Sequence, residues 1–251
     1  MSFPLVRYVL TAALRDRLIL SMILLLLLGT SLSVFFGSAA ITEKKEFAVV
    51  FTGGSLRMLG VAGLVLFTVF FVRRSFETKD IEFLLSRPVG RVRFIFSYAF
   101  AISLLAAAMG IATGLSIVAL SPLHWSAGNM LWAASIIAEN IILVNTALFF
   151  SMILSSPSTA TLITLAFYVL GRMMGQILGI LDSSPTYPVL EYIMQGISMF
   201  MPRIDLLGQT SWLLYGLGDG GIGLCFVLFQ GAVFTLMVVL AASIDLMRRQ
   251  F

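Results

Sequence analysis

The sequence predicts an all-α, polytopic membrane protein with six transmembrane helices. Hydrophobic residues make up 59% of the 251 residues and charged residues only 11%, whereas an ordinary soluble domain has about 25% charged residues. The mean hydropathy is +1.03. A chain this apolar cannot cover its own surface with polar groups. At about 20 apolar residues per span, its length allows six spans in a single transmembrane domain over residues 1–251.

The first element, residues 1–17, predicts an amphipathic helix. Val6, Val9 and Ala13 recur at helical spacing, while the arginines supply charge. Such a helix can lie along the membrane surface with its arginines among the lipid headgroups. The apolar run that follows, 18–41, predicts the first span. A cleaved signal peptide is the alternative interpretation, but this run is longer than the apolar region of such peptides.

Five further apolar runs predict the remaining spans. A short polar stretch containing a Gly53-Gly54 break comes before the second span, and Pro157 lies in the tight turn between the fourth and the fifth. The expected bounds are about 55–72, 94–120, 129–154, 159–181 and 222–244.

The segment 182–221, before the last span, differs from the other connections. It contains three prolines and two apolar pieces, 189–201 and 206–217. Both pieces are too short to cross a bilayer. We therefore expect an outer loop that carries short re-entrant or interfacial helices.

The distribution of lysine and arginine predicts the orientation. If the N-terminus is cytoplasmic, the cytoplasmic segments hold eleven of the 16 Lys and Arg residues and the outer segments hold four. This is the bias of the positive-inside rule, so both termini are expected in the cytoplasm. The net charge of +4 is then explained by topology, and we expect no nucleic-acid partner. One cysteine and one histidine argue against a metal site.

The loop 73–93 holds nine of the chain's 28 charged residues. Within it, Ile81, Leu84 and Leu85 form one apolar stripe at helical spacing, which predicts a short helix over 78–86. The helix would end at Arg87-Pro88. It could lie on the membrane or enter a groove of a partner protein. The alternative is a solvated loop whose arginines only anchor the ends of two spans.

The segment 81–91, IEFLLSRPVGR, preceded by acidic Glu77, resembles the hallmark segment of the type-2 ATP-binding cassette (ABC) transporter permeases. Lys79-Asp80 stands where that family often has a Gly-Thr pair. The resemblance implies a coupling helix between the second and third of six spans that docks into a separate ATPase subunit. It also implies that 1–17 is an elbow helix and that 182–221 carries re-entrant helices. The coupling residues it implies are Glu77, Thr78, Asp80, Ile81, Glu82, Phe83, Leu84, Leu85, Ser86, Arg87 and Pro88.

The same resemblance implies a function and partners. The chain would be the permease subunit of an ABC exporter in the bacterial cytoplasmic (inner) membrane, working as a homodimer with two ATPase subunits that bind ATP and Mg²⁺. No cofactor or catalytic residue is expected in this chain. The sequence is consistent with ATP binding in a separate subunit. The phosphate-binding motif G-x-x-x-x-G-K-[ST] requires a lysine directly after a glycine, and none of the three lysines follows a glycine.

Two other functions stay open at this point. A secondary transporter would normally show internal repeats and broken helices, and an intramembrane enzyme would need a nucleophile with its base, or a metal site. The substrate is also open between a lipid, a drug, a cofactor and a metal-related cargo. The apolar spans mildly favour a hydrophobic one.

Four polar residues lie inside the predicted spans: Glu139, Asn140 and Asn145 in the fourth, and Arg172 in the fifth. An ionisable group at the bilayer centre costs about 2.5–3.5 kcal/mol, so each should face protein or water. Glu139 and Arg172 fall at similar depths in antiparallel neighbours. We expect them to pair directly or through water, either as a structural latch or along a substrate path.

Overall fold

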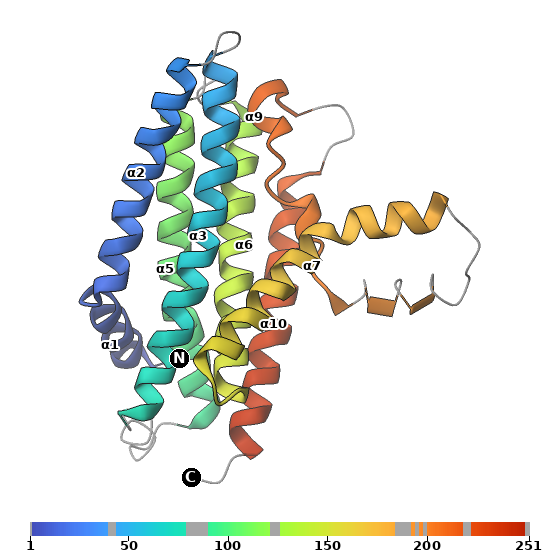
Figure 1. Ribbon diagram of the computed structural model, residues 1–251. Coiled ribbons are helices and arrows are strands. Elements are labelled where there is room, and N and C mark those ends of the chain that lie inside the picture. Colours follow the sequence, from blue (N-terminus) through green and yellow to red (C-terminus); the bar gives the residue numbers. More distant parts are fainter. Residues whose placement is uncertain are drawn as a thin grey trace.

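The computed structural model describes residues 2–39, 44–78, 90–120, 126–183, 192–193, 196–197, 200–217 and 222–248. Within these ranges all regular structure is helical, and six helices are long and apolar enough to cross a membrane. These six are α2 (Arg17–Ala39), α3 (Lys44–Glu77), α5 (Arg91–Leu120), α6 (Ala127–Ile153), α7 (Pro157–Ser183) and α10 (Leu224–Arg248). The shorter helices are α1 (Phe3–Leu14), η1 (Ile204–Leu206) and α9 (Ser211–Tyr215). The chain therefore has the architecture of a multi-pass membrane protein (Figure 1).

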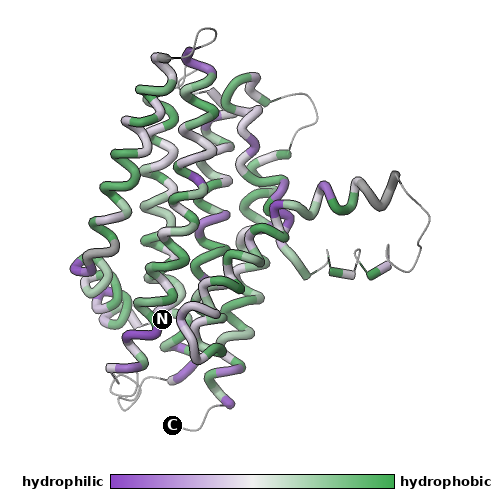
Figure 2. The backbone as a smooth tube through the Cα atoms, in the orientation of Figure 1, coloured by the Kyte–Doolittle hydropathy of each residue, from purple (hydrophilic) through white to green (hydrophobic). Residues whose placement is uncertain are grey.

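Helix α6 is the central element of the bundle. It packs against α3, α5, α7 and α10 and is the most buried of the six long helices. Its fully buried side chains include Trp132, Ile142 and Leu143. By contrast, α2 packs mainly on α3 at the edge of the bundle and leaves most of its leucines exposed. Figure 2 shows that the exposed helices are mostly apolar and that hydrophilic residues gather mainly near helix ends, as a lipid solvent requires.

Five of the six predicted spans are confirmed to within a few residues, but the predicted second span is wrong at its start. The sequence predicts a break at Gly53-Gly54 and a span from about 55, whereas α3 runs unbroken for 34 residues from Lys44. Gly53 serves packing rather than a turn, because a Cβ there would meet Leu213 Cδ1 at 3.1 Å. At 1.5 Å per residue, α3 is about 51 Å long and exceeds the roughly 30 Å hydrocarbon layer.

The expected N-terminal helix is present as α1, which packs its buried face on α5. That face contains Leu5, Val6, Val9 and Ala13. The backbone N–H of Ser2 donates a hydrogen bond to Ser97 Oγ at 2.7 Å, which fixes the start of α1 to α5. Helix α1 thus lies near the end of the bundle where α3 and α10 end and α5 begins (Figure 1).

The segment 202–217, here called the strap, connects toward α10 and contains η1 and α9. Helix α9 packs on the start of α6, where a Cβ on Gly128 would collide with the Trp212 carbonyl oxygen and come within 3.0 Å of Gly216 Cα. The chain leaves α9 at Gly216 with a φ of +71°, a conformation that glycine adopts without strain. The expected short helix within 206–217 is therefore present. Most of the expected helix at 189–201 lies outside the described residues.

Candidate functional site at the centre of the bundle

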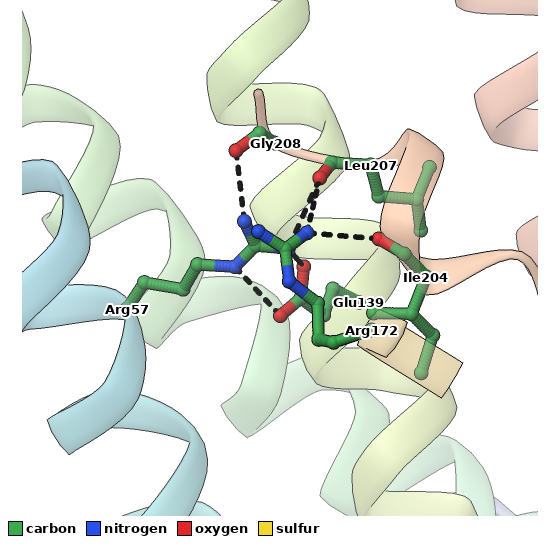
Figure 3. Close-up of polar contacts among 6 residues, drawn as sticks. All are labelled: Arg57, Glu139, Arg172, Ile204, Leu207 and Gly208. Atoms are coloured by element: carbon green, nitrogen blue, oxygen red, sulfur yellow. Dashed lines mark hydrogen bonds and ion pairs between the residues drawn. The ribbon is translucent and has the colours of Figure 1, made fainter. Parts of the chain in front are cut away.

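Three ionisable side chains lie at nearly the same depth in the bundle. At 1.5 Å per residue, Arg57 is about 20 Å from the start of α3 and Glu139 about 18 Å from the start of α6. Helix α7 crosses the bundle obliquely and its end projects to one side, so the position of Arg172 follows from its contacts (Figure 1). Arg57 pairs with Glu139 and shares the Leu207 carbonyl with Arg172, which brings all three into one layer with η1 of the strap (Figure 3).

Arg57 and Glu139 form a buried, bidentate ion pair. Arg57 Nε donates to Glu139 Oε1 at 2.8 Å, and Arg57 Nη2 donates to Oε2. Glu139 is 0% exposed and Arg57 5% exposed. Tyr168, from α7, interacts with both charged groups. Such a pair is stable in a dry interior only if both groups keep their hydrogen bonds, because each charge has lost its water.

The two arginines also hold the backbone of the strap. Arg57 donates from Nη1 to the Gly208 carbonyl at 2.8 Å and from Nη2 to the Leu207 carbonyl at 3.1 Å. Arg172 Nη1 donates to the carbonyls of Ile204 at 3.0 Å and Leu207 at 2.9 Å. Non-helical backbone at membrane depth must find such donors inside the protein. The cluster therefore anchors a non-helical segment deep in the bundle.

The predicted partner of Glu139 is corrected by these contacts. The sequence predicts a pair with Arg172, but Glu139 pairs with Arg57, and Arg172 lies beside the pair and shares the Leu207 carbonyl with Arg57. Arg57 was expected near the outer end of its span because that helix was expected to begin near residue 55. An arginine inside a long apolar run is itself a signal for a buried partner, and this signal could have identified Arg57.

The other two polar residues of α6 lie outside this cluster. Asn140 is 3% exposed and directs Nδ2 toward the Ala106 carbonyl at 3.5 Å. Asn145 Nδ2 donates to Ser103 Oγ and to the Ile141 carbonyl, both at 2.8 Å. Both contacts with other helices go to α5. The four predicted polar residues therefore belong to two regions, one facing the strap and one facing α5.

A second charged pair lies on the strap itself. Arg203 and Asp205 interact at 3.0 Å, and the side chain of Arg203 is 35% exposed. Hydrogen bonding to Asp205 raises the pKa of Arg203 above its ordinary value, because the carboxylate favours the charged guanidinium. The Arg203–Asp205 pair is partly exposed, whereas the Arg57–Glu139 pair is buried, so the two can be compared directly.

One arginine on each flank of the charged loop donates hydrogen bonds to backbone carbonyls at or just after the end of another long helix. Arg73, near the end of α3, donates to the carbonyls of Leu154 at 3.3 Å and of Ser155, which directly follow the last residue of α6. Arg91, at the start of α5, donates to the carbonyls of Leu246 and Met247 near the end of α10, both at 3.3 Å. The last carbonyls of a helix have no partner within the helix and attract cations. Each flank of the loop is thus fixed to a further long helix.

The expected coupling residues are only partly described by the structure. Glu77 closes α3, and Thr78 follows it with both its N–H and its hydroxyl donating to the Arg74 carbonyl at 2.9 Å. The remaining coupling residues lie outside the described residues: Asp80, Ile81, Glu82, Phe83, Leu84, Leu85, Ser86, Arg87 and Pro88. The helix expected at 78–86 stays a prediction.

Replacing Arg73 by glutamine is expected to lower the free energy of unfolding by about 0.5–1.5 kcal/mol, because the carbonyls of Leu154 and Ser155 lose their donor. Thermal unfolding of the purified chain in detergent measures the change. Arg74→Gln is the matched control, since the Arg74 side chain is 71% exposed and its pair with Asp16 lies at 3.3 Å on the surface. Exposed pairs contribute little. Equal effects of the two substitutions would contradict the role given to Arg73.

No protein-family model matches this chain, and no curated protein matches it. Within the described ranges, no group of three or more His, Cys, Asp or Glu residues could hold a metal ion. The function is therefore argued from the residues and their contacts.

Proposed function

We propose that this chain is the transmembrane permease subunit of an ABC exporter, driven by ATP hydrolysis in separate ATPase subunits. The observation that carries the proposal is the sequence Glu77 followed by IEFLLSRPVGR at 81–91, which falls between α3 and α5, the second and third of the six long helices. An apolar helix stripe ringed by charge suits a groove on a partner protein.

The order of the other elements supports the same proposal. Helix α1 precedes the six long helices, and exposed Arg7 on α1 and Arg15 just after it suit an elbow helix at the membrane surface. The strap, with η1 and α9, supplies short helices before α10, as re-entrant helices would. In this proposal two copies of the chain and two ATPase subunits assemble in the bacterial cytoplasmic membrane, with both termini in the cytoplasm.

The contacts of the loop flanks provide a route for motion. When ATP binding draws the ATPase subunits together, they push on the loop between α3 and α5. Arg73 then passes that displacement to the turn that follows α6, and Arg91 passes it to α10, because they bind carbonyls of these two segments. ATP can switch the spans between two states only by favouring one of them, and the docked loop gives it that preference.

The test is co-purification of the tagged full chain from its native membranes. A P-loop ATPase is expected to accompany the unmodified chain. Leu85→Asp is expected to reduce its recovery at least about tenfold, because a charge in a buried apolar contact costs more than 1.4 kcal/mol. Glu82→Lys is also expected to reduce recovery, because it reverses a charge beside that contact. Val92→Asp is the matched control, since Val92 is 42% exposed at the start of α5, beyond the proposed helix. Full ATPase recovery with Leu85→Asp would contradict the docking site.

A further inference from the structure

A cavity of about 380 Å³ lies between α5, α6 and α10, and neither the strap nor Arg57, Glu139 or Arg172 lines it. Its lining is apolar apart from Ser103, Asn145 and Thr235. Phe100, Leu228 and Leu236, which also line it, are 47%, 57% and 52% exposed, so the cavity opens on the apolar outer surface of the bundle. Its volume is within the range of small-molecule sites.

Two polar atoms of this lining are buried and have no hydrogen-bond partner among the described residues: Asn145 Oδ1 and Thr235 Oγ1. Asn145 is 1% exposed, and its amide Nδ2 is already committed to Ser103 and Ile141. Its oxygen can only accept a hydrogen bond. A buried polar atom without a partner costs about 1–3 kcal/mol, so the site is incomplete as it stands.

The hydroxyl of Thr235 differs from that of another buried helical threonine close to the cavity. Thr146, next to Asn145 on α6, donates to the carbonyl four residues before it, at 2.8 Å. Thr235 makes no such bond in α10 and lines the cavity instead. Its hydroxyl is free both to donate and to accept. A ligand hydroxyl placed between the two orphaned atoms would satisfy both, by donating to Asn145 Oδ1 and accepting from Thr235 Oγ1.

The depth of these atoms excludes ordinary bilayer lipids as the partner that satisfies them. Asn145 is about 12 Å from the end of α6, and Thr235 about 20 Å from the end of α10. Both positions lie inside the hydrocarbon layer, where a phospholipid presents only its acyl chains and no donor. The occupant must carry its polar group into the apolar region.

We propose that this cavity binds a membrane-soluble alcohol, a long apolar molecule with a hydroxyl that reaches Asn145 and Thr235. The apolar body lies along α5 and α10 and enters from the lipid. The site belongs to this chain alone and does not depend on an ATPase partner. Binding can therefore fail while ATPase docking succeeds, and the reverse also holds.

The test uses the purified full chain in phospholipid nanodiscs and two photoprobes, a diazirine-bearing hexadecanol and the same molecule capped as its methyl ether. The ether can accept but not donate a hydrogen bond. Mass spectrometry of the peptides of α5, α6 and α10 is expected to show about two- to tenfold more labelling by the alcohol, the range that one neutral hydrogen bond gives. Unlabelled hexadecanol should compete.

Thr235→Val is expected to reduce labelling by the alcohol toward that of the ether. The variant should fold normally, because the hydroxyl it removes has no partner in the described part of the chain. Thr146→Val is the matched control, since it removes a bonded hydroxyl outside the cavity and should leave labelling unchanged. Equal labelling by alcohol and ether, or full labelling of Thr235→Val, would overturn the proposal. The cavity would then be interpreted as a groove filled by the acyl chains of bilayer lipids.

A second measurement tests whether another copy of the chain covers the cavity. Ala232 is exposed and lines it. We expect Ala232→Cys, in a Cys225→Ser background, to form no disulfide between chains in membranes. Cross-linking at this position would assign the surface to an interface between copies and overturn the proposal.

Discussion

Replacing Glu139 by glutamine is expected to lower the free energy of unfolding by about 3–5 kcal/mol, the cost of breaking a buried ion pair by removing one partner. Glutamine keeps the size of the side chain and an acceptor oxygen but loses the charge. Arg57 would then remain 5% exposed, with no carboxylate opposite its guanidinium. The strap carbonyls alone do not compensate a full positive charge.

Unfolding in mixed detergent measures this loss, with Arg203→Gln as the matched control. That substitution removes the charge pair of Arg203 and Asp205, where the arginine side chain is 35% exposed. It should cost less than about 1 kcal/mol. The double variant Arg57→Gln/Glu139→Gln should be more stable than the sum of its single effects predicts, because no unpaired charge is left. A near-neutral Glu139→Gln would instead indicate that water reaches the carboxylate.

Replacing Gly110 by alanine is expected to destabilise the chain by about 1–3 kcal/mol, the usual cost of overpacking. An added Cβ would lie 2.8 Å from Ile137 Cγ1 and 3.0 Å from Ile137 Cα, so α5 and α6 would have to separate. One turn further along α5, a Cβ on Gly114 would lie 2.8 Å from Ala133 Cβ. This row of small residues allows the two helices to pack closely.

Gly60→Ala is the matched control for this substitution. It is also a glycine inside a long helix, but a Cβ there meets nothing within 4 Å and would fill a small void beside Met22 and Leu56. We expect it to be neutral or stabilising by up to about 1 kcal/mol, since alanine favours a helix over glycine. The melting temperature of Gly110→Ala should fall, and that of Gly60→Ala should stay unchanged or rise. A rise in both would mean that helix propensity, not the contact with α6, sets the effect.

The six long helices could be predicted because a lipid solvent leaves a continuous apolar run in the sequence. The prediction failed at the start of α3, where the Gly53-Gly54 pair resembles a break. Only the three-dimensional structure shows that Gly53 packs against Leu213 and Trp132, residues distant in the sequence. Packing of this kind leaves no local signal.

The location of the central site could be predicted from the sequence, but the partner of Glu139 in its ion pair could not. Glu139 and Arg172 do lie in one layer, where Arg172 shares the Leu207 carbonyl with the Arg57 that pairs with Glu139. Arg57 was missed since its depth depended on the misplaced start of α3. The strap carbonyls at Leu207 and Gly208 were out of reach of any sequence argument, because backbone acceptors carry no residue-specific signal.

The contacts of Arg57 also impose an order on biosynthesis. Arg57 is made 82 residues before Glu139 and 151 residues before Gly208. When α3 first emerges from the ribosome, Glu139 has not yet been made and Arg57 has no counter-ion. Placing the unpaired Arg57 in lipid costs about 2.5–3.5 kcal/mol. We therefore expect α3 to stay beside the insertion machinery until α6 arrives, so that the first half of the chain completes its entry into the bilayer only together with the second.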